Sequence, residues 1–310
     1  MTKNMNEQSY EDEIDLKEVF FVIWKEKLFI LAVTTAVAIG SIVYSLSLNN
    51  YFTSESLLIA RDSQDSSSLS QYSGMASLVG ISLPGSGANN SVFKVMEIIK
   101  SREFVKHLLT FENVLPSILA AKSFNSSSEE LYFDSDIYDV ETKTWVREPE
   151  GNKGVIPSYL EAHLAYLEML SISQNEITGL ISISIEHISP IFAQELLTLI
   201  IKEANKLNRD IDIDSSSKAI SFFEKELSKT SLVEIKRSIN QLLEAQLEMR
   251  MMASIHEEYS LMTIEPPFIP EKKSRPSRSF IVIFATMLGG LISVLWVLVR
   301  HYLYNEKTNN

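Results

Sequence analysis

The acidic residues and histidines that could bind a metal ion or transfer protons are spaced in a way that favours no catalytic site. The densest group, Asp210-Ile-Asp-Ile-Asp214, begins like a calcium-binding loop and contains the Asp-x-Asp pair that some glycosyltransferases use to hold a metal–nucleotide complex. It lacks glycine at the sixth position of a calcium loop, and the twelfth position is Ser221 instead of glutamate. Because the group lies between two helical patterns, we expect a solvated helix junction or N-cap there.

Other catalytic signatures are missing from the sequence. There is no cysteine, which excludes a thiolate nucleophile, a Cys-based zinc site, a disulfide framework and an iron–sulfur cluster. Neither a GxxxxGK[ST] phosphate loop nor a GxGxxG motif occurs. The histidines lack HExxH or paired-ligand spacing: His107, His163, His187, His256 and His301. We therefore expect no catalytic, cofactor-binding or metal-binding residues and no enzymatic activity.

Two long apolar segments predict a membrane protein. Residues 28–48 and 279–299 each run for 21 residues without a charge, and about 20 apolar helical residues cross a bilayer core. A buried core helix is the alternative for either segment. A cleaved signal peptide is disfavoured for the first, because its apolar region is too long and no small-residue cleavage site follows it.

The charges beside the two segments set the expected topology. Lys17, Lys25 and Lys27 precede the first span and only Arg61 follows it closely, which predicts a cytoplasmic N-terminus. The charges beside the second span favour the opposite orientation. Four basic residues precede it and two follow it: Lys272, Lys273, Arg275 and Arg278 before, Arg300 and Lys307 after. We give precedence to the first helix, which usually dominates. Residues 1–27 and 300–310 are then cytoplasmic tails, too short to fold as catalytic or output domains.

The region between the spans, residues 49–278, is large and acidic. It carries 22 Lys and Arg against 32 Asp and Glu, a net charge of −10 within a total of −12. This balance argues against a protein that coats nucleic acid. We predict one extracytoplasmic α+β domain that is attached to the membrane at both ends.

Periodicity within this domain predicts alternating strands and helices. Period-two spacing indicates a strand at Thr53–Ala60 and a hairpin of Met169–Ser173 with Gly179–His187, in which Ile181, Ile183 and Ile185 are buried. Helical spacing marks Val92–Leu109 and Ser158–Met169, and a further helix begins with Ser189 as N-cap and Pro190 at its first position. Polar or glycine-rich composition predicts loops at three places: Ser63–Ser70, Gly74–Asn90 and Ser123–Ser128.

Ser215–Met262 contains neither proline nor glycine in 48 residues. We expect one long helix, about 70 Å if unbroken, which protrudes from the domain and self-associates. The expected oligomer contacts are Leu227, Ile235, Ile239 and Leu242. A helical hairpin packed on its own domain is the alternative. The helix should end at Glu265, where four prolines in eleven residues (266–276) predict an extended connector to the second span.

Small residues recur every four positions in both spans. Ala32, Ala36 and Gly40 form one stripe, and Ala285, Gly289 and Ser293 form the other. Such stripes let membrane helices approach closely, so we expect them to face each other or a partner helix. Chance is the alternative, since these residue types are common in membrane helices.

The connector and second span resemble the signature of the polysaccharide co-polymerases, the Wzz-type chain-length determinant proteins. That signature, Pro-x2-Pro-x4-Ser-Pro-Lys-x11-Gly-x3-Gly, is matched at Pro267, Pro270, Pro276 and Gly289 with every spacing kept. Arg275, Ser277 and Ser293 depart from it. Four further segments are similar to family blocks: Glu13–Leu16 with Trp24-Lys25, Tyr51–Leu58, Ile99–Phe104 and Thr178–Pro190.

The resemblance implies a fold and a function. Members have two transmembrane helices flanking a periplasmic α/β base with a long protruding helix, and they form rings, often octamers, in the inner membrane of Gram-negative bacteria. Without known catalytic residues, they act with a Wzy-type polymerase on undecaprenyl-linked glycan and set its modal length. This chain is similar to the class without a kinase domain, as for lipopolysaccharide O-antigen. The alternative is an adaptor of a capsule or exopolysaccharide export or polymerisation complex.

Overall fold

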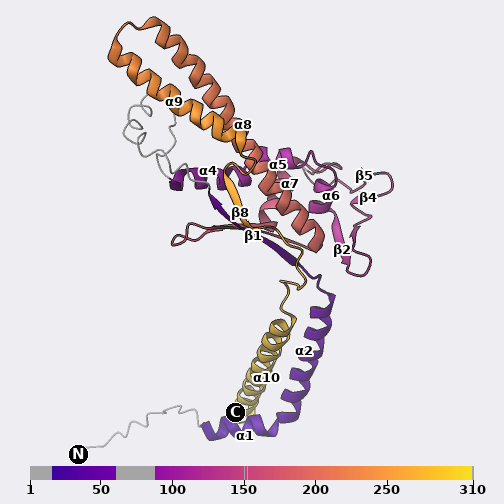
Figure 1. Cartoon of the computed structure of the whole chain (residues 1–310). Helices are drawn as coiled ribbons and strands as arrows, with labels where there is room; N and C mark the ends of the chain where they lie inside the picture. Colours follow the sequence, from indigo (N-terminus) through magenta and orange to yellow (C-terminus); the bar gives the residue numbers. More distant parts are fainter. Residues whose placement is uncertain (1–15, 61–87, 150, 152, 309–310) are drawn as a thin grey trace, which may run out of the picture. The chain divides into compact units, whose positions relative to one another are not determined.

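The computed structural model describes residues 16–60, 88–149, 151 and 153–308, and it divides the chain into two compact units (Figure 1). Met1–Asn49 and Arg275–Asn310 form the first unit, and Asn50–Ser274 forms the second. In the described residues the first unit is helical, and the second combines sheets with helices. The expected loop Ser63–Ser70 and residues 74–87 of the second expected loop lie outside the described residues, as do residues 13–15.

The first unit is built on two apolar helices, α2 (Lys27–Ser47) and α10 (Arg278–Thr308), which pack against each other. Lys27–Ser47 and Arg278–His301 are both long and apolar enough to cross a membrane. A short helix, α1 (Leu16–Lys25), precedes α2. The expected second span ends at residue 299, but the helix α10 continues to Thr308.

A four-stranded antiparallel sheet is the centre of the second unit. Its strand order is β6 (Leu170–Gln174), β7 (Ile181–His187), β1 (Phe52–Ala60) and β8 (Leu261–Glu265). The first three strands confirm the predicted strand and hairpin. The fourth corrects the prediction, because residues 261–262 belong to an edge strand paired with β1 and not to the end of a helix.

The hydrophobic core lies between one face of this sheet and the helices. Ile181, Ile183 and Ile185 of β7 are fully buried, as the alternation predicted, and Leu58 of β1 lies opposite Ile181. Helical residues close the core, among them Ile99, Phe104, Leu108, Tyr166, Leu196, Leu197 and Ile200. The apolar face of the sheet and the apolar faces of the helices thus pack together in a single layer.

Four shorter helices surround the core: α4 (Ala88–Lys100), α5 (Arg102–Leu108), α6 (Val114–Leu119) and α7 (Tyr159–Met169). The single helix expected at Val92–Leu109 is broken at Ser101, whose hydroxyl accepts a hydrogen bond from the Phe104 amide and caps α5. The helix α7 agrees with the predicted one and begins with a capping box between Ser158 and Glu161.

Two small hairpins join α6 to α7 and were not predicted. They are β2 (Ala121–Asn125) with β3 (Glu130–Phe133), and β4 (Tyr138–Asp139) with β5 (Thr144–Trp145). The expected polar linker Ser123–Ser128 instead contains the end of β2 and its turn, where Asn125 Oδ1 accepts a hydrogen bond from the Ser127 amide.

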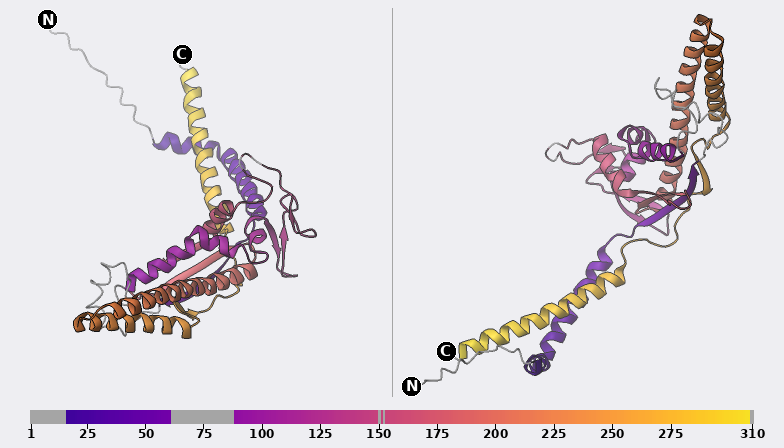
Figure 2. Two further views of the ribbon diagram at one scale, coloured as in Figure 1. Left: turned by 90° about the horizontal axis from the view of Figure 1, so that it is seen from above. Right: turned by 90° about the vertical axis from the view of Figure 1, so that its left-hand side faces the viewer.

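A long helical hairpin completes the second unit. α8 (Pro190–Lys229) begins with the predicted Ser189 cap and Pro190, and α9 (Val233–Ile255) packs back along it (Figures 1 and 2). The expectation of one continuous helix over Ser215–Met262 is therefore wrong. The chain forms a helical hairpin, as in the alternative, but α9 packs mainly on α8 and not on the rest of the domain. Thr230 and Leu232 take extended backbone angles and reverse the chain between the two helices. The fold class is confirmed: an α+β body with a long helix, flanked in sequence by two apolar helices.

Candidate functional site

The inner face of the α8–α9 hairpin is formed by small and apolar residues. Ser216, Ile220 and Phe223 of α8 are buried, and so are Ala245 and Ala253 of α9. The small side chains at three of these positions allow a close approach of the two helices. Much of the helical stripe that predicted self-association is thus used within one chain.

The expected oligomer contacts lie on both helices of this hairpin. Leu227 is on α8 and is half-buried; Ile239 and Leu242 are on α9 and are also half-buried. Ile235 stays 45% exposed, and Leu232 and Val233 at the turn are more exposed still. Further along α9, Leu247, Met251 and Ile255 are exposed at intervals of four residues and share one helical face. Apolar side chains therefore remain on the outside of the hairpin.

The acidic group Asp210–Asp214 lies inside α8, where we expected a helix junction. The Asp212 carboxylate accepts from Lys94 Nζ at 3.3 Å, and Asp214 accepts from Lys218 Nζ one turn later at 2.6 Å. Burial raises the pKa of Tyr259, and the neighbouring Asp212 carboxylate raises it further. Among the described residues, no group of three or more His, Asp or Glu side chains is arranged to hold a metal ion. These carboxylates act in ion pairs.

Asn205, on the apolar stripe of α8, holds the edge strand β8 in place. Its Oδ1 accepts from the amides of Ser260 and Leu261, both at 2.8 Å, and its Nδ2 donates to the Leu261 carbonyl at 2.9 Å. One turn later, Asn208 donates to the Ser260 hydroxyl. An asparagine within an apolar helical stripe was the only sequence signal for this contact.

Hydroxyl groups attach the connector after β8 to the sheet. Ser54 and Ser56 of β1 donate to the carbonyls of Phe268 and Glu265, each at 2.7 Å. Ser274 donates through its amide to the Tyr51 carbonyl at 2.8 Å. Of the motif prolines in this connector, Pro270 is buried and Pro267 is half-buried. Pro276 is half-buried and stands just before α10.

Two histidines of the second unit have structural partners. His187 is buried, its Nε2 donates to the Ser117 carbonyl at 2.9 Å, and its Nδ1 accepts from the Ser189 amide at 3.0 Å. Burial lowers the pKa of His187 to about 4, which keeps the imidazole neutral near pH 7. His107 faces the buried Glu203 carboxylate at 2.8 Å.

The α2–α10 pair places the two small-residue stripes differently. On α10, Gly289 and Ser293 are buried and Ala285 is half-buried. A Cβ atom on Gly289 would lie only 2.8 Å from Val37 Cγ1 of α2, so this glycine sits at the closest approach.

The stripe on α2 lies on another side of that helix. Ala32, Ala36 and Gly40 are exposed, and the buried positions of α2 are Ser41 and Ser45. The expectation that the two stripes face each other is therefore wrong. Residues with larger side chains, such as Val37, fill the contact with α10 instead. Contact of the α2 stripe with a partner helix stays a prediction.

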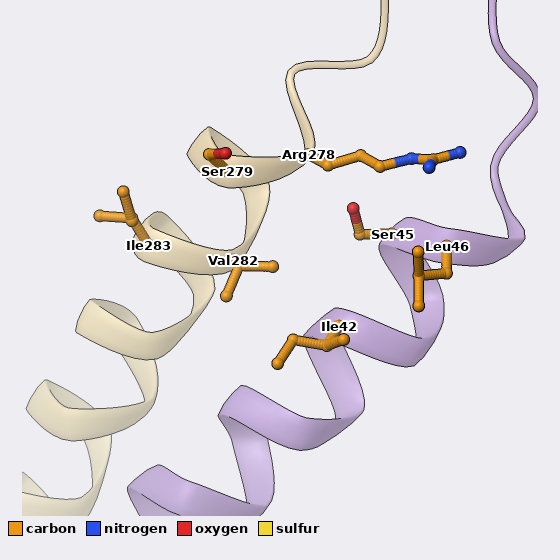
Figure 3. Close-up of a pocket in the computed structure, with 7 residues that line it drawn as sticks. All are labelled: Ile42, Ser45, Leu46, Arg278, Ser279, Val282 and Ile283. Atoms are coloured by element: carbon orange, nitrogen blue, oxygen red, sulfur yellow. The ribbon is translucent and has the colours of Figure 1, made fainter.

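A groove of about 380 Å³ opens between the C-terminal end of α2 and the N-terminal end of α10 (Figure 3). Arg278 lies at its end, where Nη2 donates to the Leu48 carbonyl at 3.4 Å. The seven residues that line the groove are Ile42, Ser45, Leu46, Arg278, Ser279, Val282 and Ile283.

Part of this chain is similar in sequence to a known protein family. Residues 12–110 match the family model Wzz, chain length determinant protein. Comparison with curated protein sequences gives no match. Several solved structures are similar, among them the following two. A full-length bacterial polysaccharide co-polymerase is 13% identical, with 94% of this chain and 99% of that chain covered and a TM-score of 0.38.

The second is a fragment of WzzB, a polysaccharide co-polymerase from Salmonella Typhimurium, which is 12% identical. The alignment covers 73% of this chain and 100% of that fragment, with a TM-score of 0.33. The family match spans α1, α2, β1, α4 and α5. It includes three of the four further segments that resemble family blocks: Glu13–Leu16 with Trp24-Lys25, Tyr51–Leu58 and Ile99–Phe104. Residues 12–110 thus form a Wzz-type chain length determinant region, and the resemblance predicted from the sequence is confirmed.

Proposed function

We propose that this chain is a non-enzymatic regulator of the modal length of a surface polysaccharide. The polymer is lipopolysaccharide O-antigen, and the partner is a Wzy-type polymerase that extends undecaprenyl-linked glycan. The observation that carries the proposal is the match of residues 12–110 to the Wzz family. The polymer and the polymerase follow from the resemblance.

The placement in the cell is part of the same proposal. The helices α2 and α10 cross the bacterial inner membrane, both tails are cytoplasmic, and residues 49–278 form a periplasmic domain. Two helices of suitable length and composition support this placement, as does the charge asymmetry at the first span.

In the proposed mechanism, several copies of the chain associate into a ring in the membrane. The exposed apolar residues of the hairpin, including Leu232, Val233 and Met251, support contacts between copies. The ring presents a surface, or fixes a stoichiometry, that limits how long the polymerase retains a growing chain. No bond is made or broken by this chain itself.

Deletion of the gene tests the proposal. The lipopolysaccharide of the deletion strain, separated on a silver-stained gel, should lose the modal cluster of band lengths while polymerised O-antigen is still present. A plasmid copy of the gene should restore the modal cluster. An unchanged ladder, with unchanged length of every other surface glycan, would contradict the proposal. If the purified chain also retained a transporter and no polymerase, a role in an export complex would replace it.

A further inference from the structure

The groove between α2 and α10 contains a buried hydroxyl group that has no hydrogen-bond partner among the described residues. Ser45 is 2% exposed, and its Oγ is unpaired. Its neighbours in the helix pair behave differently: Ser41 Oγ donates to the Ala38 carbonyl, Thr286 Oγ1 to Val282, and Ser293 Oγ to Gly290. A serine hydroxyl in an apolar helix usually donates in this way to a backbone carbonyl three or four residues earlier. An unpaired hydroxyl in a groove therefore indicates a ligand with a hydrogen-bonding group.

The end of the groove that contains Ser45 is electropositive. The Arg278 guanidinium lies there (Figure 3). The helix α10 begins at Arg278 and has no acidic residue in its first turn. A helix N-terminus adds a partial positive charge and amide donors that no intrahelical carbonyl satisfies. Charge and hydrogen-bonding capacity at this end suit an anionic group with several oxygen atoms, such as a phosphate.

The remainder of the groove is apolar and open to the surroundings of the helices. Ile42, Leu46, Val282 and Ile283 form its walls, and Leu46 and Ile283 are 62% and 67% exposed. In helices that cross a bilayer, such side chains contact acyl chains. The residues Leu48 and Arg278 stand at the ends of the two apolar helices, at the level of lipid headgroups.

We propose that this groove binds a phospholipid with an anionic phosphate headgroup. The phosphate accepts hydrogen bonds from Ser45 Oγ and from Arg278, and the acyl chains lie along Ile42, Leu46 and Ile283. The apolar walls are the reason to expect a lipid and not free inorganic phosphate. The inference requires the two helices to cross a membrane, but it is independent of the proposed control of chain length.

Lipid retention by the full-length protein tests the inference. The protein is reconstituted into vesicles of equal parts phosphatidylglycerol and phosphatidylcholine, extracted in mild detergent, and its bound lipids are counted by native mass spectrometry. The wild type should retain phosphatidylglycerol preferentially. Because a charge-assisted hydrogen bond is the larger contribution, Arg278→Gln should lower this retention roughly tenfold and Ser45→Ala roughly threefold. Arg278→Lys should restore part of it, since the charge remains.

Two matched controls separate this site from general attraction to the bilayer. Ser47→Ala removes a hydroxyl that donates to the Tyr44 carbonyl near the same helix end. Arg300→Gln removes a charge toward the other end of α10. Both should retain lipid like the wild type. Ser45→Ala removes a single unbonded hydroxyl, so it tests the site even if Arg278→Gln weakens the helix pair.

Two outcomes would overturn the inference. Equal retention by Ser45→Ala, Arg278→Gln and the wild type would show that the groove does not select the lipid. Displacement of phosphatidylglycerol by millimolar inorganic phosphate, with thermal stabilisation by phosphate alone, would assign the site to the free anion. Neither outcome would bear on the lipopolysaccharide ladder, so failure here is distinguishable from failure of the proposed function.

Discussion

Polar side chains that are buried or half-buried in the α+β unit bind backbone groups that are distant in the sequence. His187 on β7 binds the Ser117 carbonyl of α6, and Asn205 on α8 binds the backbone of Leu261 at the start of β8. His163 on α7 contacts the Lys100 carbonyl at the end of α4. Each contact satisfies a polar group that is at least half-buried and also fixes the end of another element. Single substitutions at these residues should therefore have consequences beyond one hydrogen bond.

His187 should make the protein less stable as the pH falls below neutrality. The pKa of His187 is lowered from 6.5 to about 4 in the folded chain, mainly by burial. Between these values the unfolded chain binds the additional proton, so the free energy of unfolding falls by up to about 1.4 kcal/mol per pH unit as the pH decreases. Urea unfolding of the full-length protein in detergent, followed by tryptophan fluorescence at pH 7 and pH 5, measures this slope.

The substitution His187→Gln should remove that slope. At pH 7 it should also cost about 1–3 kcal/mol, because the imidazole hydrogen bonds are lost or distorted. Glu161 does not interfere, since Arg147 lowers the pKa of this carboxyl to about 2 and its effect on stability lies below pH 4.5. His256→Gln, at the C-terminal end of α9, is the matched control and should keep the slope. An equal slope in His187→Gln would contradict the assignment.

Among the elements, the α2–α10 pair depends on one close approach. Gly289 belongs to the family motif and lies against Val37, whereas Gly40 of the other helix has no atom within 4 Å of an added Cβ. The two glycines, which both belong to small-residue stripes, thus have different roles. Only Gly289 limits the distance between the helices.

Gly289→Ala should destabilise the helix pair. Its new methyl group would overlap Val37, whose β-branched side chain has little rotamer freedom, and overpacking costs about 1–3 kcal/mol. The thermal unfolding temperature in detergent should fall. Gly40→Ala, the control, should leave it unchanged or raise it, because alanine favours the helix. Val37→Ala combined with Gly289→Ala should recover the loss; equal behaviour of the two glycine variants would refute this role.

The edge strand β8 depends on α8 for its position. Asn205→Ala would leave the half-buried Ser260 amide and the buried Leu261 amide without their acceptor, at a cost of about 1–3 kcal/mol. Hydrogen exchange followed by mass spectrometry should show faster exchange in residues 258–265 than in β7. Asn240→Ala, at an exposed position of α9, provides the control and should exchange like the wild type. Uniformly faster exchange throughout the sheet would instead indicate that Asn205 supports the whole core.

At the scale of the whole molecule, the exposed apolar residues of the hairpin bear on self-association. Val233 is 77% exposed at the turn between α8 and α9. Leu242, one of the expected oligomer contacts, is half-buried, so a charge there would disturb the hairpin itself. A substitution at the turn separates the two effects.

Val233→Asp should weaken the contact between copies without unfolding the hairpin. A charge placed in an apolar interface is left desolvated and unpaired, so light scattering of the detergent-solubilised protein should report smaller species. Circular dichroism should keep its helical signal. Glu234→Gln, one residue away, should leave the mass unchanged. If Val233→Asp and the wild type have the same mass, the copies contact one another elsewhere.

Local patterns in the sequence predicted many of the elements correctly. The two uncharged segments marked α2 and α10, the Ile–Ser alternation marked β7, and Ser189-Pro190 marked the start of α8. These signals succeed because each depends on residues within one or two turns or on one face of a strand. The helix α7 is another example, since its apolar spacing predicted a helix over Ser158–Met169.

The positions of those elements in space were decided by contacts between distant residues. The reversal at residues 230–232 has no proline or glycine to mark it, and a helical stripe is the same whether it packs on α8 or on another copy. The strand β8 forms because Asn205 and β1, 56 or more residues away, bind its backbone. The sequence by itself therefore determined which segments are apolar, helical or extended. Only the tertiary structure decided which faces meet, because a periodic pattern specifies a buried face but not the surface that buries it.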